Sequence, residues 1–255
     1  LRPYGGVAYL PVSDYNQFQT WLGQAACANA QLSQASPYAV LARAGALPGS
    51  DNWTHQYHDP GNTVMSNDEL VKTPLGLLWF GGPTHFDVLP RHGHGPAPQV
   101  IDGRLFIEGP DMIRAVDVYT GRLLWQKQMT DVGDQYNYTS HEAGANGLGS
   151  NFVSLSDGVY IFQGSVCYRL DPATGNELGT LTLPAGSAGA TPKFGYALAI
   201  DSFLVVCSGP QRFDALEMGT LETLNGTSSQ DLVVMNRYTG QVLWKTALDS
   251  LETFR

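Results

Sequence analysis

The sequence has little charge, few cysteines and no long apolar run. Only 15% of its 255 residues are charged, the net charge is −9, and no basic cluster occurs. A surface that binds nucleic acid is therefore not expected. No segment comes near the roughly 20 consecutive apolar residues that a membrane-spanning helix needs, so we expect no membrane span.

The three cysteines are Cys27, Cys167 and Cys207. They are too few and too widely spaced for a disulfide framework or a zinc site, and we expect three buried free thiols. The sequence also has no Cys-x-x-Cys-His motif for haem attachment and no Gly-x-Ser-x-Gly motif of the hydrolases.

The sequence is rich in turn residues, with 29 glycines and 15 prolines beside 43% hydrophobic residues. This composition favours many short strands over long helices. Three units repeat along the chain, and they begin at Asp102, Asp157 and Asp201. In each unit an Asp-Gly or Asp-Ser turn and two short apolar segments precede an Asp/Asn-x-x-Thr-Gly turn. The repeated positions are Asp117, Thr120, Gly121 and Trp125, then Asp171, Thr174 and Gly175, then Asn236, Thr239, Gly240 and Trp244.

Each repeated position has a physical role in the predicted turn. The Asp or Asn side chain can accept hydrogen bonds from turn amides, and glycine can take the positive φ that the turn needs. Trp125 and Trp244 end the following strand, where a large ring can pack between neighbouring sheets. The second unit has Gly179 at this place, so we expect one such ring to be missing.

Four short strands per unit predict sheets arranged radially around a channel. The pattern Ala-x-Asp-x-x-Thr-Gly-x-x-x-Trp, complete in 115–125, resembles the propeller repeat named after pyrroloquinoline quinone (PQQ). The resemblance covers about 51–248 and implies a mainly β fold, a partial β-propeller of four-stranded blades.

We divide the chain into a small α/β segment, 1–50, and a propeller segment, 51–255, of about three blades plus an outer strand. That strand is predicted at Pro74–Trp79, and Asp51–Thr63 resembles the segment that leads into such propellers. An open propeller leaves bare strand edges, so the remaining blades are expected from missing sequence or from a partner chain.

The first fifty residues lack the repeat. A helix is predicted after Ser13 or Asp14, and a strand is predicted at 38–42. The turn Leu1-Arg2-Pro3-Tyr4-Gly5-Gly6 resembles a turn late in class I S-adenosylmethionine methyltransferases; an ordinary α/β cap is the alternative. Because the chain starts abruptly at Leu1, we expect the native N-terminus to be missing.

The candidate ligand residues are polar groups predicted at one rim of the channel. Arg91, His92 and His94 precede a predicted inner strand, and two histidines at i and i+2 of an extended segment point the same way. They could bind a metal or an anion, although no third ligand has a diagnostic spacing. The other candidates are Glu108, Asp111, His141 and Glu142, and the alternative is that all are ordinary loop residues.

Several functions stay open at this stage. The leading hypothesis is a binding or scaffolding module. Alternatives are a quinoprotein-type oxidoreductase with its cofactor residues in missing blades, a propeller attached to a methyltransferase, and an enzyme that uses the histidine-rich rim. The resemblance implies adjacent cysteines and a Glu, Asn and Asp set around the quinone; adjacent cysteines do not occur, so these residues do not support PQQ. Proteins with this repeat are mostly exported bacterial proteins, which implies the periplasm or envelope, whereas a methyltransferase would imply the cytoplasm.

Overall fold

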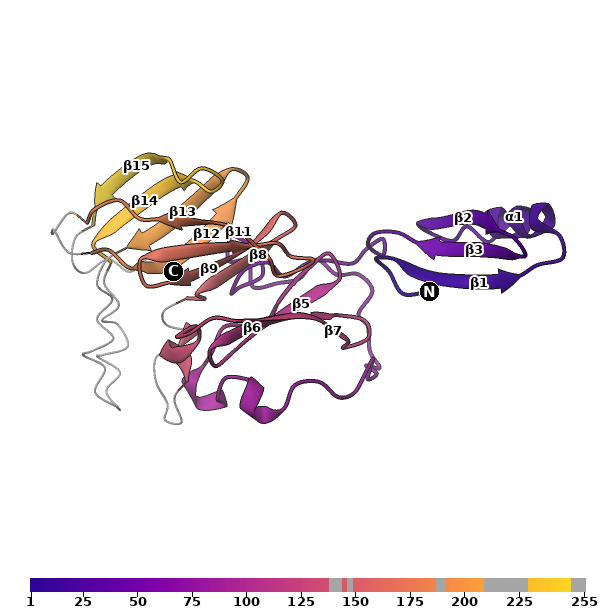
Figure 1. The fold of residues 1–255 in the computed structure, drawn as a ribbon, viewed down its shortest axis with the longest axis horizontal. Coiled ribbons are helices and arrows are strands. Elements are labelled where there is room, and N and C mark those ends of the chain that lie inside the picture. Colours follow the sequence, from indigo (N-terminus) through magenta and orange to yellow (C-terminus); the bar gives the residue numbers. More distant parts are fainter. Residues whose placement is uncertain (138–143, 146–148, 187–190, 209–228, 249–255) are drawn as a thin grey trace.

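The structure is a computed structural model that describes residues 1–137, 144–145, 149–186, 191–208 and 229–248. In these ranges the chain is mainly β, with three four-stranded antiparallel sheets and one three-stranded sheet. The four-stranded sheets fan out beside one another, and the three-stranded sheet lies apart from them (Figure 1).

Each four-stranded sheet is a meander of consecutive strands, as in a propeller blade. The first strands of the sheets, β4, β8 and β12, lie innermost, and β8 contacts both of the others. Blade I contains β4 (Gln99–Ile101), β5 (Arg104–Gly109), β6 (Met112–Asp117) and β7 (Leu123–Gln128). Blade II contains β8 (Phe152–Leu155), β9 (Gly158–Gln163), β10 (Val166–Leu170) and β11 (Glu177–Thr182). Blade III contains β12 (Phe194–Ile200), β13 (Phe203–Ser208), β14 (Asp231–Asn236) and β15 (Val242–Ala247).

The turn between the third and fourth strands of each blade has the predicted structure. In blade I, Asp117 Oδ1 accepts the amide N–H groups of Tyr119 and Thr120, at 3.0 and 3.1 Å. Asp171 and Asn236 make the equivalent bonds in blades II and III. The glycines have φ values of 69°, 73° and 74° at Gly121, Gly175 and Gly240, which confirms the prediction.

The core lies between the blades, in two clusters. Phe106, Trp125, Phe152 and Ile161 belong to the cluster between blades I and II. The other cluster lies between blades II and III and contains Val153, Tyr160, Phe162, Phe194, Leu204 and Met235. Because each blade buries its faces against its neighbours, the three blades form one continuous arc.

Trp125 joins blade I to blade II as the sequence predicts. Its indole N–H donates to Pro172 O at 2.9 Å. Its ring covers Gly175, where an added Cβ would lie 2.6 Å from the nearest ring carbon. The ring therefore requires glycine at this turn.

Trp79 makes the same contacts one blade earlier. Its indole N–H donates to Val118 O at 2.9 Å, and a Cβ on Gly121 would lie 2.4 Å from its ring. Val118 follows the turn aspartate of blade I, as Pro172 follows that of blade II. Pro74–Trp79 is nevertheless not a strand, contrary to our prediction, because no described segment pairs with it.

The seam between blades II and III lacks a tryptophan, also as predicted. A Cβ added to Gly240 would lie 3.4 Å from its nearest neighbour, Leu181 Cδ2. Arg237 of blade III instead reaches blade II and donates to Asp157 Oδ1 at 2.7 Å and to Tyr160 OH at 2.6 Å. An ion pair thus strengthens the seam where the ring is missing.

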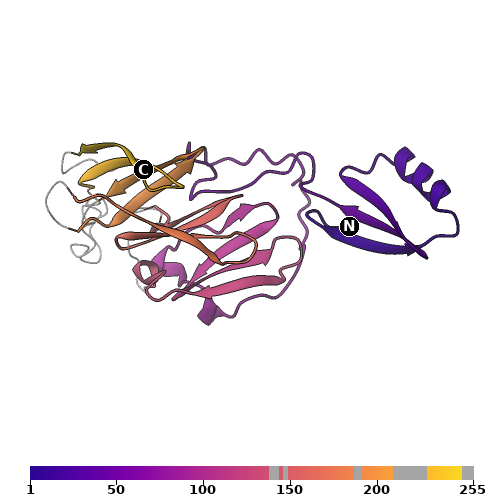
Figure 2. The ribbon, with the colours of Figure 1, turned by 45° about the horizontal axis from the view of Figure 1, so that its top comes forward.

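The first fifty residues form a separate unit of strand, helix and two strands, which agrees with the predicted helix and second strand. It contains β1 (Gly6–Pro11), α1 (Tyr15–Gln24), β2 (Ala30–Ala35) and β3 (Tyr38–Arg43), in the sheet order β1-β3-β2. Asp14 caps α1 by accepting the Gln17 amide at 3.0 Å. Both views place this unit beyond blade I (Figures 1 and 2), and Arg2 pairs with Asp117 at 2.9 Å. Among the described residues, no helix is long and apolar enough to cross a bilayer.

Candidate functional site

The segment 51–63 runs along the inner strands of all three blades. Trp53 pairs with Val100 of β4 through hydrogen bonds of 2.8 and 2.7 Å between their backbones. Thr54 O accepts the Ser154 amide of β8 at 3.1 Å, and the His55 ring accepts the Ala199 amide of β12 at 3.2 Å. Three successive residues therefore tie together the three inner strands.

His55 serves this segment as a neutral hydrogen-bond acceptor. Its side chain is buried, with 2% of the residue exposed, and this burial lowers its pKa to about 4. Because Nε2 accepts the Ala199 N–H, the proton lies on Nδ1, which donates to Thr54 Oγ1 at 2.7 Å. His55 is not among the candidates predicted from the sequence, because its partner lies 144 positions away.

Glu108 and Asn151 meet inside the seam between blades I and II. Asn151 Nδ2 donates to Glu108 Oε1 at 2.5 Å, and both side chains are buried. Burial raises the pKa of Glu108 to about 8, so the carboxyl group is largely protonated at pH 7. Glu108 Oε2 and Asn151 Oδ1 have no hydrogen-bond partner among the described residues.

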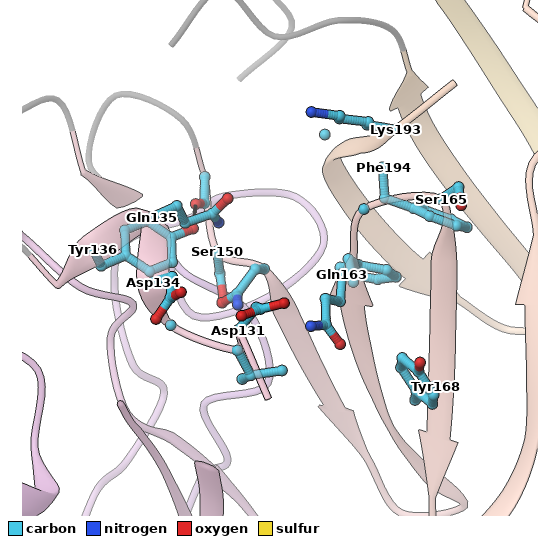
Figure 3. Close-up of a pocket in the computed structure, with 17 residues that line it drawn as sticks. Asp131, Asp134, Gln135, Tyr136, Ser150, Gln163, Ser165, Tyr168, Lys193 and Phe194 are labelled. Atoms are coloured by element: carbon cyan, nitrogen blue, oxygen red, sulfur yellow. Dashed lines mark hydrogen bonds between the residues drawn. The ribbon is translucent and has the colours of Figure 1, made fainter. Parts of the chain in front are cut away.

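A pocket of about 520 Å³ opens at the same seam, and Asn151 is one of its lining residues. Figure 3 shows Asp131 and Asp134 on the side of blade I, and Gln163, Ser165 and Lys193 on the side of blades II and III. The inner wall includes buried Tyr136, whose hydroxyl donates to Gly149 O at 2.8 Å. Burial and the nearby Glu108 raise the pKa of Tyr136 well above its usual value, so the phenol stays protonated.

The histidine-rich segment differs from its prediction. Arg91–Gly93 forms a short 3-10 helix (η2) after Pro90, and His94 follows with a φ of 49°, so the segment is not extended. The expected parallel alignment of His92 and His94 is therefore wrong. His94 O accepts the Ala145 amide at 2.7 Å, which ties the segment to the connection between blades I and II.

Two other candidate residues lie in one hairpin of blade I. Glu108 is in β5, and Asp111 is in the turn that follows. Asp111 Oδ1 accepts the Asp131 amide at 2.7 Å, so this turn supports the wall of the pocket. His141 and Glu142 lie outside the described residues. Within the part of the chain that the structure describes, no three His, Cys, Asp or Glu side chains are grouped to hold a metal.

The main polar groups of the pocket are not among the candidates predicted from the sequence. Asp131 and Asp134 follow β7 in the connection between two blades, and two acids in such a connection were a usable signal. The 3-10 helix η3 (Asp134–Tyr136) lies in this connection, whereas η1 (His85–Asp87) lies before β4 and blade I. Lys193 precedes β12 and had no such signal, because only the packing of blade III brings it to this seam.

Comparison with protein-family models and with curated proteins gives no match. Solved structures do match. The quinohemoprotein alcohol dehydrogenase from Comamonas testosteroni has a TM-score of 0.50 and 15% identity, over 77% of this chain and 27% of that chain.

Two other similar structures have lower TM-scores. The quinohemoprotein alcohol dehydrogenase from Pseudomonas putida HK5 has a TM-score of 0.49 and 18% identity, over 78% of this chain and 27% of that chain. BamB from Moraxella catarrhalis has a TM-score of 0.31 and 19% identity, over 59% of this chain and 52% of that chain.

The fold is a partial β-propeller, as the sequence predicts. The likeness to the Comamonas testosteroni enzyme, at 15% identity, concerns the fold alone. The chain spans 27% of the length of the two alcohol dehydrogenases.

The described residues do not fit a quinone site of the kind that the repeat implies. Cys167 and Cys207 are buried in different blades, and burial raises the pKa of both thiols; Cys27 is exposed, contrary to our prediction of three buried thiols. Glu108 contacts Asn151, and no further His, Cys, Asp or Glu side chains are grouped with it among the described residues to complete such a ligand set.

Proposed function

We propose that this chain is a binding or scaffolding module, an arc of three blades in a larger PQQ-type propeller. The contact of Trp79 with Gly121 carries the proposal, because it repeats the contact of Trp125 with Gly175 between blades I and II. In blade I, the tryptophan that makes this contact lies in the outer strand β7. Blade I therefore already makes the contact through which a preceding blade would pack against it.

The opposite flank of the arc supports the same proposal. Trp244 of blade III stands where Trp125 stands in blade I, and it is 50% exposed. A further blade would cover it, as blade II covers Trp125. The propeller segment would then be 51–255, with 1–50 as a separate unit held to it by Arg2 and Asp117.

The proposed ligand-binding end of the arc is the one that bears the pocket. Glu108 and Asp111 both contact residues that line it, Asn151 and Asp131, and Arg91, His92 and His94 lie next to the connection between blades I and II. The pocket is concave and brings polar groups of two seam walls together, and small-molecule sites are usually concave. We therefore place ligand recognition at this end.

An absorbance titration distinguishes this function from an oxidoreductase. The protein from the full reading frame is mixed with PQQ and calcium, and its spectrum and dye-linked dehydrogenase activity are recorded. A binding module gives the sum of the separate spectra and no dye reduction. A quinone spectrum shifted by the protein, together with dye reduction, would overturn the proposal in favour of an oxidoreductase whose cofactor residues lie in other blades.

A further inference from the structure

The pocket between blades I and II has walls of unequal charge. Asp131 and Asp134 face it from the connection that follows β7. The remaining described lining residues supply one positive side chain, Lys193, on the opposite side (Figure 3). The lining therefore carries an excess of one negative charge when both aspartates are ionised.

Asp134 is the carboxyl group of that wall whose pKa is shifted. Partial burial raises its pKa, and the negative charges of Asp111 and Asp131 raise it further. The Asp131 amide donates to Asp111 Oδ1 at 2.7 Å, so the backbone holds these two residues together. A bound cation would relieve this repulsion, because an opposite charge stabilises the ionised form of a carboxyl group.

The pocket also has a buried acceptor that lacks a donor. Asn151 lines the pocket, is 6% exposed, and its Oδ1 has no partner among the described residues. Behind it lies the buried Glu108, whose Oε1 accepts from Asn151 Nδ2 at 2.5 Å. Buried acceptors are normally satisfied, so this wall is suited to a guest that carries hydrogen-bond donors.

We propose that this pocket binds an organic ammonium ion, of the diamine or polyamine class, with an ammonium group between the two aspartates. The pocket volume of about 520 Å³ lies in the range of small-molecule sites. Tyr168 and Phe194 line the pocket on the other side, where aromatic faces attract alkylammonium groups. A bare metal ion fits less well, because the described residues hold no group of three metal ligands.

The test is calorimetric titration of the 255-residue chain with cadaverine and with the diol of equal length. Cadaverine should bind and the diol should not, and the affinity should fall as salt is added. Asp134→Asn should weaken cadaverine binding roughly tenfold or more, since it removes one charge-assisted hydrogen bond. Lys193→Gln should strengthen it, because the single positive side chain of the lining is lost.

Glu69→Gln is the matched control, since it removes one exposed negative charge outside the pocket. It should bind cadaverine like the unaltered chain, and circular dichroism should show all three variants folded. Equal binding of the diol, no binding of cadaverine, or unchanged affinity in folded Asp134→Asn would each overturn the proposal. The inference rests on the proposed function for the place of ligand recognition, and these outcomes test that place; the proposed arc within a larger propeller is tested separately, at the tryptophans of its two flanks.

Discussion

Two buried side chains near the inner strands, His55 and Glu108, are neutral at pH 7 for the same physical reason. Burial disfavours the charged form, which lowers the pKa of His55 to about 4 and raises that of Glu108 to about 8. The consequences for stability have opposite signs. Acid favours the unfolded state through His55, and base favours it through Glu108.

We expect the titration of His55 to change the free energy of unfolding between pH 6.5 and about 4. In this window the unfolded histidine binds a proton that the folded one does not, so the free energy of unfolding falls as the pH falls. The full loss is roughly 3 kcal/mol, at 1.36 kcal/mol per pKa unit. Denaturant unfolding at a series of pH values measures it, in a Glu108→Gln background that removes the opposing titration.

His55→Gln in the same background supplies the control for this prediction. Its carboxamide oxygen can accept the Ala199 amide but does not titrate, so the dependence on pH between 6.5 and 4 should flatten. An equally steep decline with and without His55 would show that another group causes it.

The sequence predicted local features of single residues well and distant contacts poorly. The aspartate and glycine turns followed from the residue types, because their hydrogen bonds join residues two or three positions apart. The contact of Glu108 with Asn151 spans 43 positions, and that of His55 with Ala199 spans 144. Such contacts depend on how the blades pack, which the repeat alone does not specify.

At the scale of elements, the repeat predicted the blades but not every segment between them. The twelve blade strands correspond to the three repeat units, because the alternation of apolar and polar residues and the turn residues define each strand locally. The histidine-rich segment forms a 3-10 helix instead of extended backbone, and Pro74–Trp79 lacks a partner strand. Both differences arise where the conformation depends on neighbours outside the segment.

The two seams between blades predict that a Gly→Ala substitution lowers stability more at Gly175 than at Gly240. Gly175→Ala and Gly240→Ala both place a side chain at positive φ, which costs about 1–2 kcal/mol. Only Gly175→Ala also brings the Cβ within 2.6 Å of the Trp125 ring, whereas at Gly240 the nearest atom is 3.4 Å away, on Leu181. Thermal unfolding should therefore show a clearly larger loss for Gly175→Ala. Equal losses would mean that the Trp125 ring moves away without cost.

At the scale of the whole molecule, one series of equivalent contacts runs from Trp79, before blade I, to the turn of blade III. Trp79 covers the turn of blade I, Trp125 covers that of blade II, and Leu181 takes the place of a ring at blade III. Trp244, the next member, is half exposed. The same residue type in the same place of the repeat is therefore buried in blade I and half exposed in blade III.

This difference predicts how two tryptophans contribute in two forms of the protein. In the 255-residue chain, Trp125→Ala should cost about 3–5 kcal/mol, because a buried ring and its hydrogen bond to Pro172 are lost. Trp244→Ala should cost less than about 1 kcal/mol there, as for exposed residues. In the protein from the full reading frame, a neighbouring blade should cover Trp244, so the loss of stability on Trp244→Ala should rise toward that on Trp125→Ala. Denaturant unfolding of both variants in both forms measures these losses. A loss on Trp244→Ala that stays small in the longer protein would show that no blade packs against this face of blade III.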